Sequence, residues 1–301
     1  MTTLLEHLDK IKHLIPPATE LSIEVLEGGY SNKAYCLSWQ GLPRWVLRVP
    51  GLDAQDFQIS RISEKIALNK AQESLISPSC LYFDDTSGLM VSQFVAQKAY
   101  EWQVNHKDFD IVRLAKSTRI IHEMPSNQHH YDLKKVILGY LDSAEKKLSK
   151  DNLLRQEIGF LQDLSFSYLK NIRPYQSVMC HNDINPKNCL ADDLHFWVID
   201  WEYAGLGDAL FDISLIFSSH NLSTYQQTLF LQHYDNSLNL NELKSDFINY
   251  QLLYKIREMA WLLLKHTSTP QDVEAIQCYH AFKQEVLEDI ARNKVETLTT
   301  L

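Results

Sequence analysis

The sequence is poor in cysteine and has no long apolar run. Its five cysteines are an odd number and include no C-x-x-C pair, so they indicate buried free thiols in a reducing compartment and not disulfides or a cysteine-rich zinc site. No apolar stretch approaches the roughly 20 residues that span a bilayer. Residues 1–17 carry Glu6, Asp9 and Lys10 inside an apolar pattern, which predicts an amphipathic helix and not a secretory signal. We therefore expect a cytoplasmic protein without membrane insertion.

The sequence also lacks an excess of positive charge and any low-complexity tract. Lys and Arg number 29 against 38 Asp and Glu, a formal net charge of -9. This acidic balance disfavours nucleic acid and anionic membranes as partners and is compatible with a cationic small molecule. With 301 residues and no repeat at a fixed period, the chain has room for one large domain or two unequal lobes.

The apolar pattern changes character near residue 96. Before that point, short runs typical of strands are separated by turn sequences, and a single helical stretch interrupts them. After it, segments of helix length carry apolar residues three and four apart. The pattern predicts an α+β fold with lobes at residues 1–96 and 97–301. The apolar residues of the helical stretch are Ile59, Ile62, Ile66 and Leu68, and the predicted strands are residues 21–27, 33–39, 44–50, 81–84 and 89–95.

One strand-like island, residues 177–201, interrupts the helical part. Asp183 and Asn188 lie five apart in its central turn, and Asp200 follows 12 residues later, so a hairpin-like return would bring the three side chains together. Two carboxylates and an amide oxygen are hard ligands suited to Mg²⁺. An isolated Asp-x-x-x-x-Asn is as often a turn or a cap, and the strand ends are what favour a metal site here.

The stretch "HNDINPKN", followed by "VIDWEYAGLGDALFDIS", resembles the catalytic and metal loops of kinase-like small-molecule phosphotransferases. Within that superfamily the chain is most similar to choline/ethanolamine kinases, with thiamine kinases and aminoglycoside phosphotransferases as relatives. The resemblance implies a protein-kinase-like fold with an ATP-binding N-terminal lobe, an antiparallel sheet with one helix, and a larger, mainly helical C-terminal lobe. It also implies that Asp183 orients the acceptor hydroxyl or accepts its proton, and that Asn188 and Asp200 bind Mg²⁺.

The resemblance extends into the small lobe. In "EGGYSNKAYCL", Gly29 would let the backbone approach phosphates, and Ser31 and Asn32 add side-chain donors, although neither the P-loop pattern nor the full G-x-G-x-x-G is present. Arg48 in "WVLRVPG" stands where protein kinases carry a phosphate-binding lysine, and Glu64 on the next helix is its expected partner. A guanidinium fork can hold a phosphate and a carboxylate together.

Further roles follow from the same resemblance. The backbone from Gln93 to Val95, in "MVSQFVA", is expected at the interlobe hinge, where it would hydrogen-bond adenine. His181 is expected to shape the catalytic loop and not to move protons. Asp212 is expected to brace that loop from the following helix.

A cationic acceptor would be recognised by aromatic faces and carboxylates. Tyr203, in "DWEYAG", matches a tyrosine near the choline site of the family. Trp261 resembles the first of two cage tryptophans, with Leu264 at the position of the second, and Tyr279 is a further candidate wall. For each aromatic residue, packing in the core is the alternative.

The expected carboxylate of that cage departs from the family pattern. Counting from Tyr203, the position of the cation-binding glutamate is occupied by Ser219, so Glu202 becomes a candidate to face the acceptor or to tune the metal site. We therefore expect an ATP- and Mg²⁺-dependent kinase, a monomer or homodimer, that acts on choline or ethanolamine. A thiamine kinase or an aminoglycoside-type phosphotransferase are the alternatives, and an inactive nucleotide-binding module is the alternative of a different class.

Overall fold

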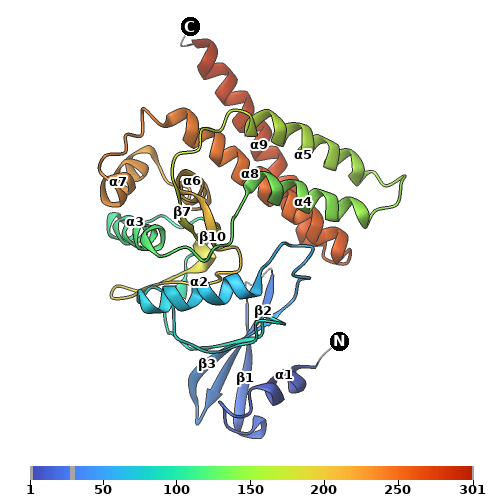
Figure 1. Cartoon of the computed structure of the whole chain (residues 1–301), viewed down its shortest axis with the longest axis vertical. Coiled ribbons are helices and arrows are strands. Elements are labelled where there is room, and N and C mark those ends of the chain that lie inside the picture. The colour runs from blue at the N-terminus through green and yellow to red at the C-terminus, as the bar shows by residue number, and fades with distance from the viewer. Residues whose placement is uncertain (1–2, 28–30, 300–301) are drawn as a thin grey trace.

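The computed structural model describes residues 3–27 and 31–299 (Figure 1). Its N-terminal lobe is a five-stranded antiparallel sheet in the order β1-β2-β3-β5-β4. All five predicted strands are confirmed, and β-branched and aromatic residues recur along them. They are β1 (Leu21–Leu26), β2 (Asn32–Trp39), β3 (Leu42–Pro50), β4 (Cys80–Phe83) and β5 (Met90–Gln93).

The first helix, α1 (Leu4–Lys10), confirms the predicted amphipathic helix. Thr3 and Glu6 form a capping box at its start, with reciprocal hydrogen bonds of 3.4 and 2.8 Å. Leu8 packs with Leu37 and other apolar side chains of the sheet. The start of the chain thus packs against the sheet and forms part of a small core in the N-terminal lobe. A short 3-10 turn, η1 (Ala18–Glu20), leads from it into β1.

The second helix, α2 (Arg61–Glu73), lies between the sheet and the helical lobe (Figure 1). The predicted helix is confirmed. Of the four apolar residues that predicted it, Ile59 and Leu68 are buried, whereas Ile62 and Ile66 are 64% and 36% exposed. The buried face of α2 carries Arg61 and Glu64 together with Ala67, Leu68 and Ala71. Arg61 and Glu64 point into the protein because their ion-pair partners lie in the site described below.

The C-terminal lobe is built around one long helix, α8 (Lys244–Ser268), which packs against α4, α5, α6 and α9 (Figure 1). Arg257 is the one charged residue among the buried residues of α8. No helix in the described ranges is both long and apolar enough to cross a membrane. The other helices of this lobe are α3 (Asp108–Glu123), α4 (Leu133–Lys146), α5 (Leu154–Leu169), α6 (Ala209–Ser219), α7 (Thr224–Tyr234) and α9 (Val273–Thr299).

Short strands position the polar island of the sequence. β7 (Ser177–Cys180) pairs with β10 (Gly205–Asp208), and β8 (Cys189–Ala191) lies between β6 (Lys98–Ala99) and β9 (Phe196–Val198). The β8–β9 hairpin confirms the predicted return of the chain, and the Ile199 N–H donates to the Asn188 carbonyl at 3.0 Å. The 3-10 turn η2 (Pro186–Asn188) and the residues after β9 therefore meet at one end of the hairpin.

Candidate active site

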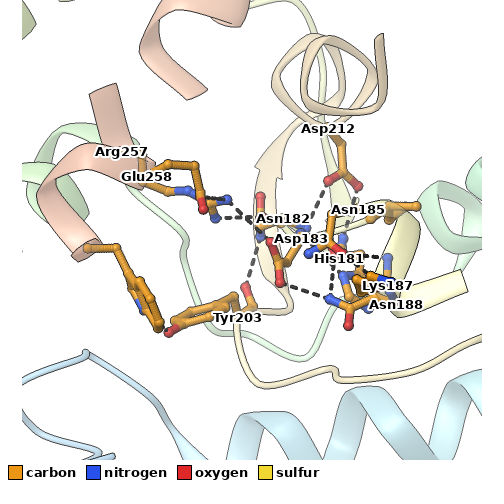
Figure 2. A network of polar contacts seen from close by, with 12 residues as sticks. His181, Asn182, Asp183, Asn185, Lys187, Asn188, Tyr203, Asp212, Arg257 and Glu258 are labelled. Atoms are coloured by element: carbon orange, nitrogen blue, oxygen red, sulfur yellow. Dashed lines mark hydrogen bonds and ion pairs between the residues drawn. The ribbon is translucent and has the colours of Figure 1, made fainter. Parts of the chain in front are cut away.

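The loop that follows β7 is held by one buried carboxylate. Asp212, in the first turn of α6, accepts the backbone N–H groups of His181 at 3.0 Å and Asn182 at 2.8 Å (Figure 2). Burial alone would raise the pKa of Asp212, but the hydrogen bond from His122 and the loop donors lower it, so the carboxylate is charged. The bracing role predicted for Asp212 is confirmed.

His181 shapes the loop through both of its ring nitrogens. Its Nε2 lies 3.0 Å from the Ile199 carbonyl, and the Asp183 N–H donates to its Nδ1 at 3.2 Å. The neutral tautomer with its proton on Nε2 satisfies both hydrogen bonds. Burial lowers the pKa of His181 to about 4, which keeps the ring uncharged near neutral pH. The predicted structural role is confirmed.

Asp183 and Asn188 lie side by side (Figure 2). Asn188 Nδ2 donates to Asp183 Oδ2 and to the Asp183 carbonyl, both at 2.9 Å. Because Nδ2 is committed to Asp183, Asn188 Oδ1 is the amide atom left for a cation. Burial raises the pKa of Asp183 to about 7; Arg257 opposes the shift and Glu258 adds to it. A carboxylate with a pKa near 7 is well matched to accepting a proton.

Asp200 reaches the same site from the end of β9, with a left-handed backbone at φ 65°. Its Oδ1 lies 3.1 Å from Arg48 Nη1. Burial raises the pKa of Asp200 to about 6, with Arg48 opposing the shift and Glu64 and Asp183 adding to it. The repulsion between Asp200 and Asp183 arises because the two carboxylates share one site. With Asn188 they form an all-oxygen donor set, which fits Mg²⁺.

The N-terminal lobe adds a buried ion-pair cluster. Arg48 Nη2 lies 2.5 Å from Glu64 Oε1, which confirms the predicted pairing, and it donates to the Gly88 carbonyl at 3.2 Å. Arg61 Nη1 approaches the other oxygen of Glu64 at 2.7 Å. Gly88 has φ 78°, and a Cβ there would collide with the Arg61 guanidinium, so both its conformation and the contact require glycine.

Glu202 extends this cluster to the C-terminal lobe. Its Oε2 accepts hydrogen bonds from Arg61 at 3.2 Å and from Asn32 Nδ2 at 3.3 Å. Burial raises the pKa of Glu202 to about 7, and Asp200 adds to the shift. Glu202 therefore lies with Arg61, Glu64 and Asn32 in the ion-pair cluster and not in an aromatic cage. One N–H of the Asn32 side-chain amide is thus bonded to Glu202, and the second N–H of this amide remains a possible donor to a phosphate.

Two of the residues predicted to bind nucleotide, Arg48 and Glu64, line a cavity between the lobes. The lining of this cavity does not include Ser31, Asn32, Gln93 or Val95. Arg48 and Asp200 line this cavity together with Met90 of the sheet and Ile199. Gly29 lies outside the described residues, and the Ser31 carbonyl accepts the Gly51 N–H at 3.1 Å.

In the segment expected at the hinge, two of the three backbone N–H groups already donate hydrogen bonds within the N-terminal lobe. The Gln93 N–H donates to the Ser79 carbonyl at 2.8 Å, and the Phe94 N–H donates to the Arg44 carbonyl at 2.9 Å. Val95 N–H has no hydrogen-bond partner among the described residues. Of these three N–H groups, that of Val95 is the one available to a base.

Tyr203 lies next to the loop that follows β7. Its carbonyl accepts the Asn182 side-chain amide at 3.0 Å, and its hydroxyl accepts the Trp261 Nε1–H at 2.9 Å. Beside Tyr203 is a cavity of about 110 Å³. The remaining lining residues of this cavity are Gln58, His129, His130, Tyr131, Asp132, Lys135, Val136 and Tyr140.

Tyr279 does not line the cavity beside Tyr203. Its side chain is fully buried, and its hydroxyl donates to Glu157 of α5 at 2.5 Å. Ser219 and Leu264 are also buried. For Tyr279, the alternative of packing in the helical core is the one that its surroundings support.

Sequence reasoning missed two buried arginines, Arg61 and Arg257. Arg61 stands three residues before Glu64 on α2, a spacing that places the two charges on one helix face. Arg257 is a single charge inside the apolar run of α8, and its guanidinium contacts the Asn182 carbonyl and Asp183 (Figure 2). A lone charge in a buried helix face is itself a signal, because such a charge must find a partner.

Comparisons with known proteins show the family to which the chain belongs. The model of the phosphotransferase enzyme family matches residues 22–242. The protein LicA of Haemophilus influenzae is 45% identical over 60 residues, which are 20% of this chain and 22% of that protein. The chain therefore aligns with only about a fifth of that relative's length.

Two solved structures share the fold over almost the whole chain. Choline kinase LicA from Streptococcus pneumoniae has a TM-score of 0.77 at 18% identity and covers 95% of this chain and 97% of its own. A structure of LicA in complex with AMP has a TM-score of 0.73 at 17% identity and covers 96% and 100%. The protein-kinase-like fold is thus confirmed, and the chain belongs to the phosphotransferase enzyme family.

Proposed function

We propose that this phosphotransferase uses ATP and Mg²⁺ to phosphorylate the hydroxyl group of a small cationic amino alcohol, choline or ethanolamine. One observation carries the proposal: Asp183, Asn188 and Asp200 converge next to the buried pair of Arg48 and Glu64. Two solved structures with the same fold support the finer assignments, since one is a choline kinase and the other is LicA in complex with AMP.

Each polar group has a role in this reaction. Asn188 Oδ1 and the Asp200 carboxylate would hold Mg²⁺, which when bound neutralises and orients the phosphates. The Arg48 fork would contact a phosphate while keeping its carboxylate partners. Asp183 would orient the acceptor hydroxyl and accept its proton, and its raised pKa makes it a stronger base than an ordinary aspartate.

The cavity beside Tyr203 is our candidate for the acceptor's cationic end. Tyr131, Tyr140 and Tyr203 line it, and aromatic faces attract quaternary and primary ammonium groups. Burial lowers the pKa of His129, so this ring adds no positive charge near neutral pH. At about 110 Å³ the cavity is well below the roughly 300–1,000 Å³ of pockets for drug-sized ligands, which favours a small alcohol over an aminoglycoside.

A substrate screen tests the proposal. ADP release by the purified protein is measured with Mg²⁺, ATP and, in turn, choline, ethanolamine, thiamine and an aminoglycoside. We expect choline or ethanolamine to stimulate ADP release most strongly. Replacing Asp183 by Asn should lower kcat by about 10²- to 10⁴-fold, the usual worth of a general base, whereas Asp193→Asn, on the exposed β8–β9 turn, should leave kcat unchanged.

The other outcomes are equally informative. Stimulation by thiamine or an aminoglycoside alone would overturn the acceptor assignment and leave the phosphoryl-transfer chemistry intact. Mg²⁺-dependent ATP binding without turnover on any alcohol would instead favour an inactive nucleotide-binding module.

A further inference from the structure

Arg257 of α8 is a buried charge to which the proposed function assigns no role. Its side chain is 3% exposed, and its guanidinium lies against the rings of Tyr254 and Phe211 at 5.5 and 5.9 Å. A charge so deeply buried costs several kcal/mol unless it is paired and hydrogen-bonded. The hydrogen-bond partners of Arg257 therefore indicate which groups it positions.

One nitrogen of the guanidinium, Nη1, donates a hydrogen bond to the backbone carbonyl that precedes the proposed catalytic aspartate. Arg257 Nη1 donates to the Asn182 carbonyl at 2.7 Å and to the Tyr131 hydroxyl at 3.2 Å. Asn182 has φ 63°, a left-handed conformation that is uncommon for residues other than glycine. Its N–H is held by Asp212 and its side-chain amide by the Tyr203 carbonyl. Arg257 is thus the third anchor of a residue whose backbone would otherwise be free to relax.

The other arm reaches the catalytic carboxylate itself. Arg257 Nη2 lies 3.4 Å from Asp183 Oδ1, while Asn188 holds Oδ2 at 2.9 Å (Figure 2). The two contacts fix the rotation of the carboxylate from opposite oxygens. Glu258 pairs with the same Nη2 at 2.5 Å. Its charge offsets the guanidinium, so a cationic acceptor need not approach an unbalanced positive group.

We propose that Arg257 is a positioning residue, which orients Asp183 by holding both the Asn182 carbonyl and Asp183 Oδ1. The inference rests on the proposed catalytic role of Asp183. Arg257 acts through the loop and contributes little to nucleotide affinity, because none of its described contacts involves Arg48, Glu64 or Asp200.

Kinetics of Arg257→Met and Arg257→Lys test the inference, with the acceptor that the screen identifies. A misplacement of about 1 Å near the reacting groups can cost about 10²-fold in rate. We expect kcat of Arg257→Met to fall about 10- to 100-fold, with the KM for Mg²⁺·ATP within about 2-fold of wild type. Arg257→Lys keeps the charge but cannot bridge two acceptors with a planar fork, so its kcat should lie in between.

Lys255→Met is the matched control on the same helix. It removes ion pairs of 3.0 and 2.9 Å to Glu285 and Asp289 of α9, away from the loop. We expect it to leave kcat unchanged even where it lowers Tm. In an Arg257→Ala variant, added guanidinium chloride at millimolar concentration should restore part of kcat, and it should not raise the activity of the Lys255→Met control. Wild-type kcat in folded Arg257→Met or Arg257→Lys, or an equal loss in the control, would overturn the inference.

Hydrogen exchange gives a readout that does not depend on the acceptor. The N–H groups of His181 and Asn182 are protected by hydrogen bonds to Asp212. Releasing the Asn182 carbonyl should loosen this loop, so its amides should exchange faster in Arg257→Met and Arg257→Lys and not in Lys255→Met. Unchanged exchange contradicts the positioning role. If the wild-type protein phosphorylates none of the alcohols, the proposed function fails, and the exchange measurement still decides whether Arg257 holds the loop.

Discussion

Two histidines, His106 and His220, form a buried pair next to Ile184 of the loop that follows β7. His220 Nε2 lies 3.1 Å from the Ile184 carbonyl, and His106 Nε2 lies 2.8 Å from His220 Nδ1. Because the Ile184 carbonyl can only accept, His220 Nε2 donates to it, and His106 Nε2–H then donates to His220 Nδ1. Burial lowers the pKa of His220 to about 3 with His106 adding to the shift, and burial lowers that of His106. The loop therefore depends on both rings being neutral.

This pairing makes folding stability dependent on pH. A histidine whose pKa is lowered by folding binds its proton more readily in the unfolded chain, so the free energy of unfolding falls as pH drops below about 6.5 and continues to fall toward the folded pKa. Each such group contributes a slope of about 1.4 kcal/mol per pH unit. Urea unfolding of wild type and His220→Gln at pH 7, 6 and 5 should give a shallower pH dependence in the variant. Parallel curves for the two proteins would refute this account.

At the scale of elements, α2 ties the two lobes together. It presents Arg61 and Glu64 on one face, and these meet Arg48 of β3 on one side and Glu202 after β9 on the other. All four side chains are nearly inaccessible to solvent. Removing one member of such a cluster leaves an uncompensated buried charge, which lowers the free energy of unfolding more than the loss of a surface ion pair does.

Two variants of α2 compare the loss of a buried ion pair with the loss of a surface ion pair. Arg61→Met should lower the free energy of unfolding by about 3–5 kcal/mol, since Glu202 then loses its arginine partner. Lys65→Met removes a pair of 3.2 Å with Asp85 in which both side chains are about half exposed, and should cost less than about 1 kcal/mol. Chemical denaturation followed by circular dichroism measures both. Equal losses would mean that the cluster does not brace the lobes.

At the scale of the whole molecule, the proposed metal and nucleotide ligands come from both lobes. Arg48 belongs to the N-terminal sheet, and Asn188 and Asp200 belong to the C-terminal lobe. A ligand that binds across both lobes stabilises the folded state by mass action, by about 2.7 kcal/mol at a concentration 100 times its Kd.

Thermal unfolding should report this linkage. We expect Mg²⁺ with ATP to raise Tm, and EDTA to remove the Mg²⁺-dependent part of the increase. Asp200→Asn should lose that Mg²⁺-dependent part as well, because a neutral amide is a weaker ligand for a hard cation. Asp193→Asn, on the exposed turn, should behave as wild type. A Tm that does not respond to Mg²⁺ in wild type would contradict the proposed metal site.

The sequence by itself determined the strands, the helices and the group of Asp183, Asn188 and Asp200, because these depend on apolar periodicity and on residues close to the two ends of one short hairpin. Only the tertiary structure decided which face of α2 is buried, the pairing of Glu202 with Asn32 from 170 residues away, and the contact of Arg257 with Asp183 from 74 residues away. The spacing of apolar residues along the chain indicates which face of a helix or strand prefers to be buried. Which buried charges meet one another is set by how the lobes and helices pack, and local spacing does not contain that information.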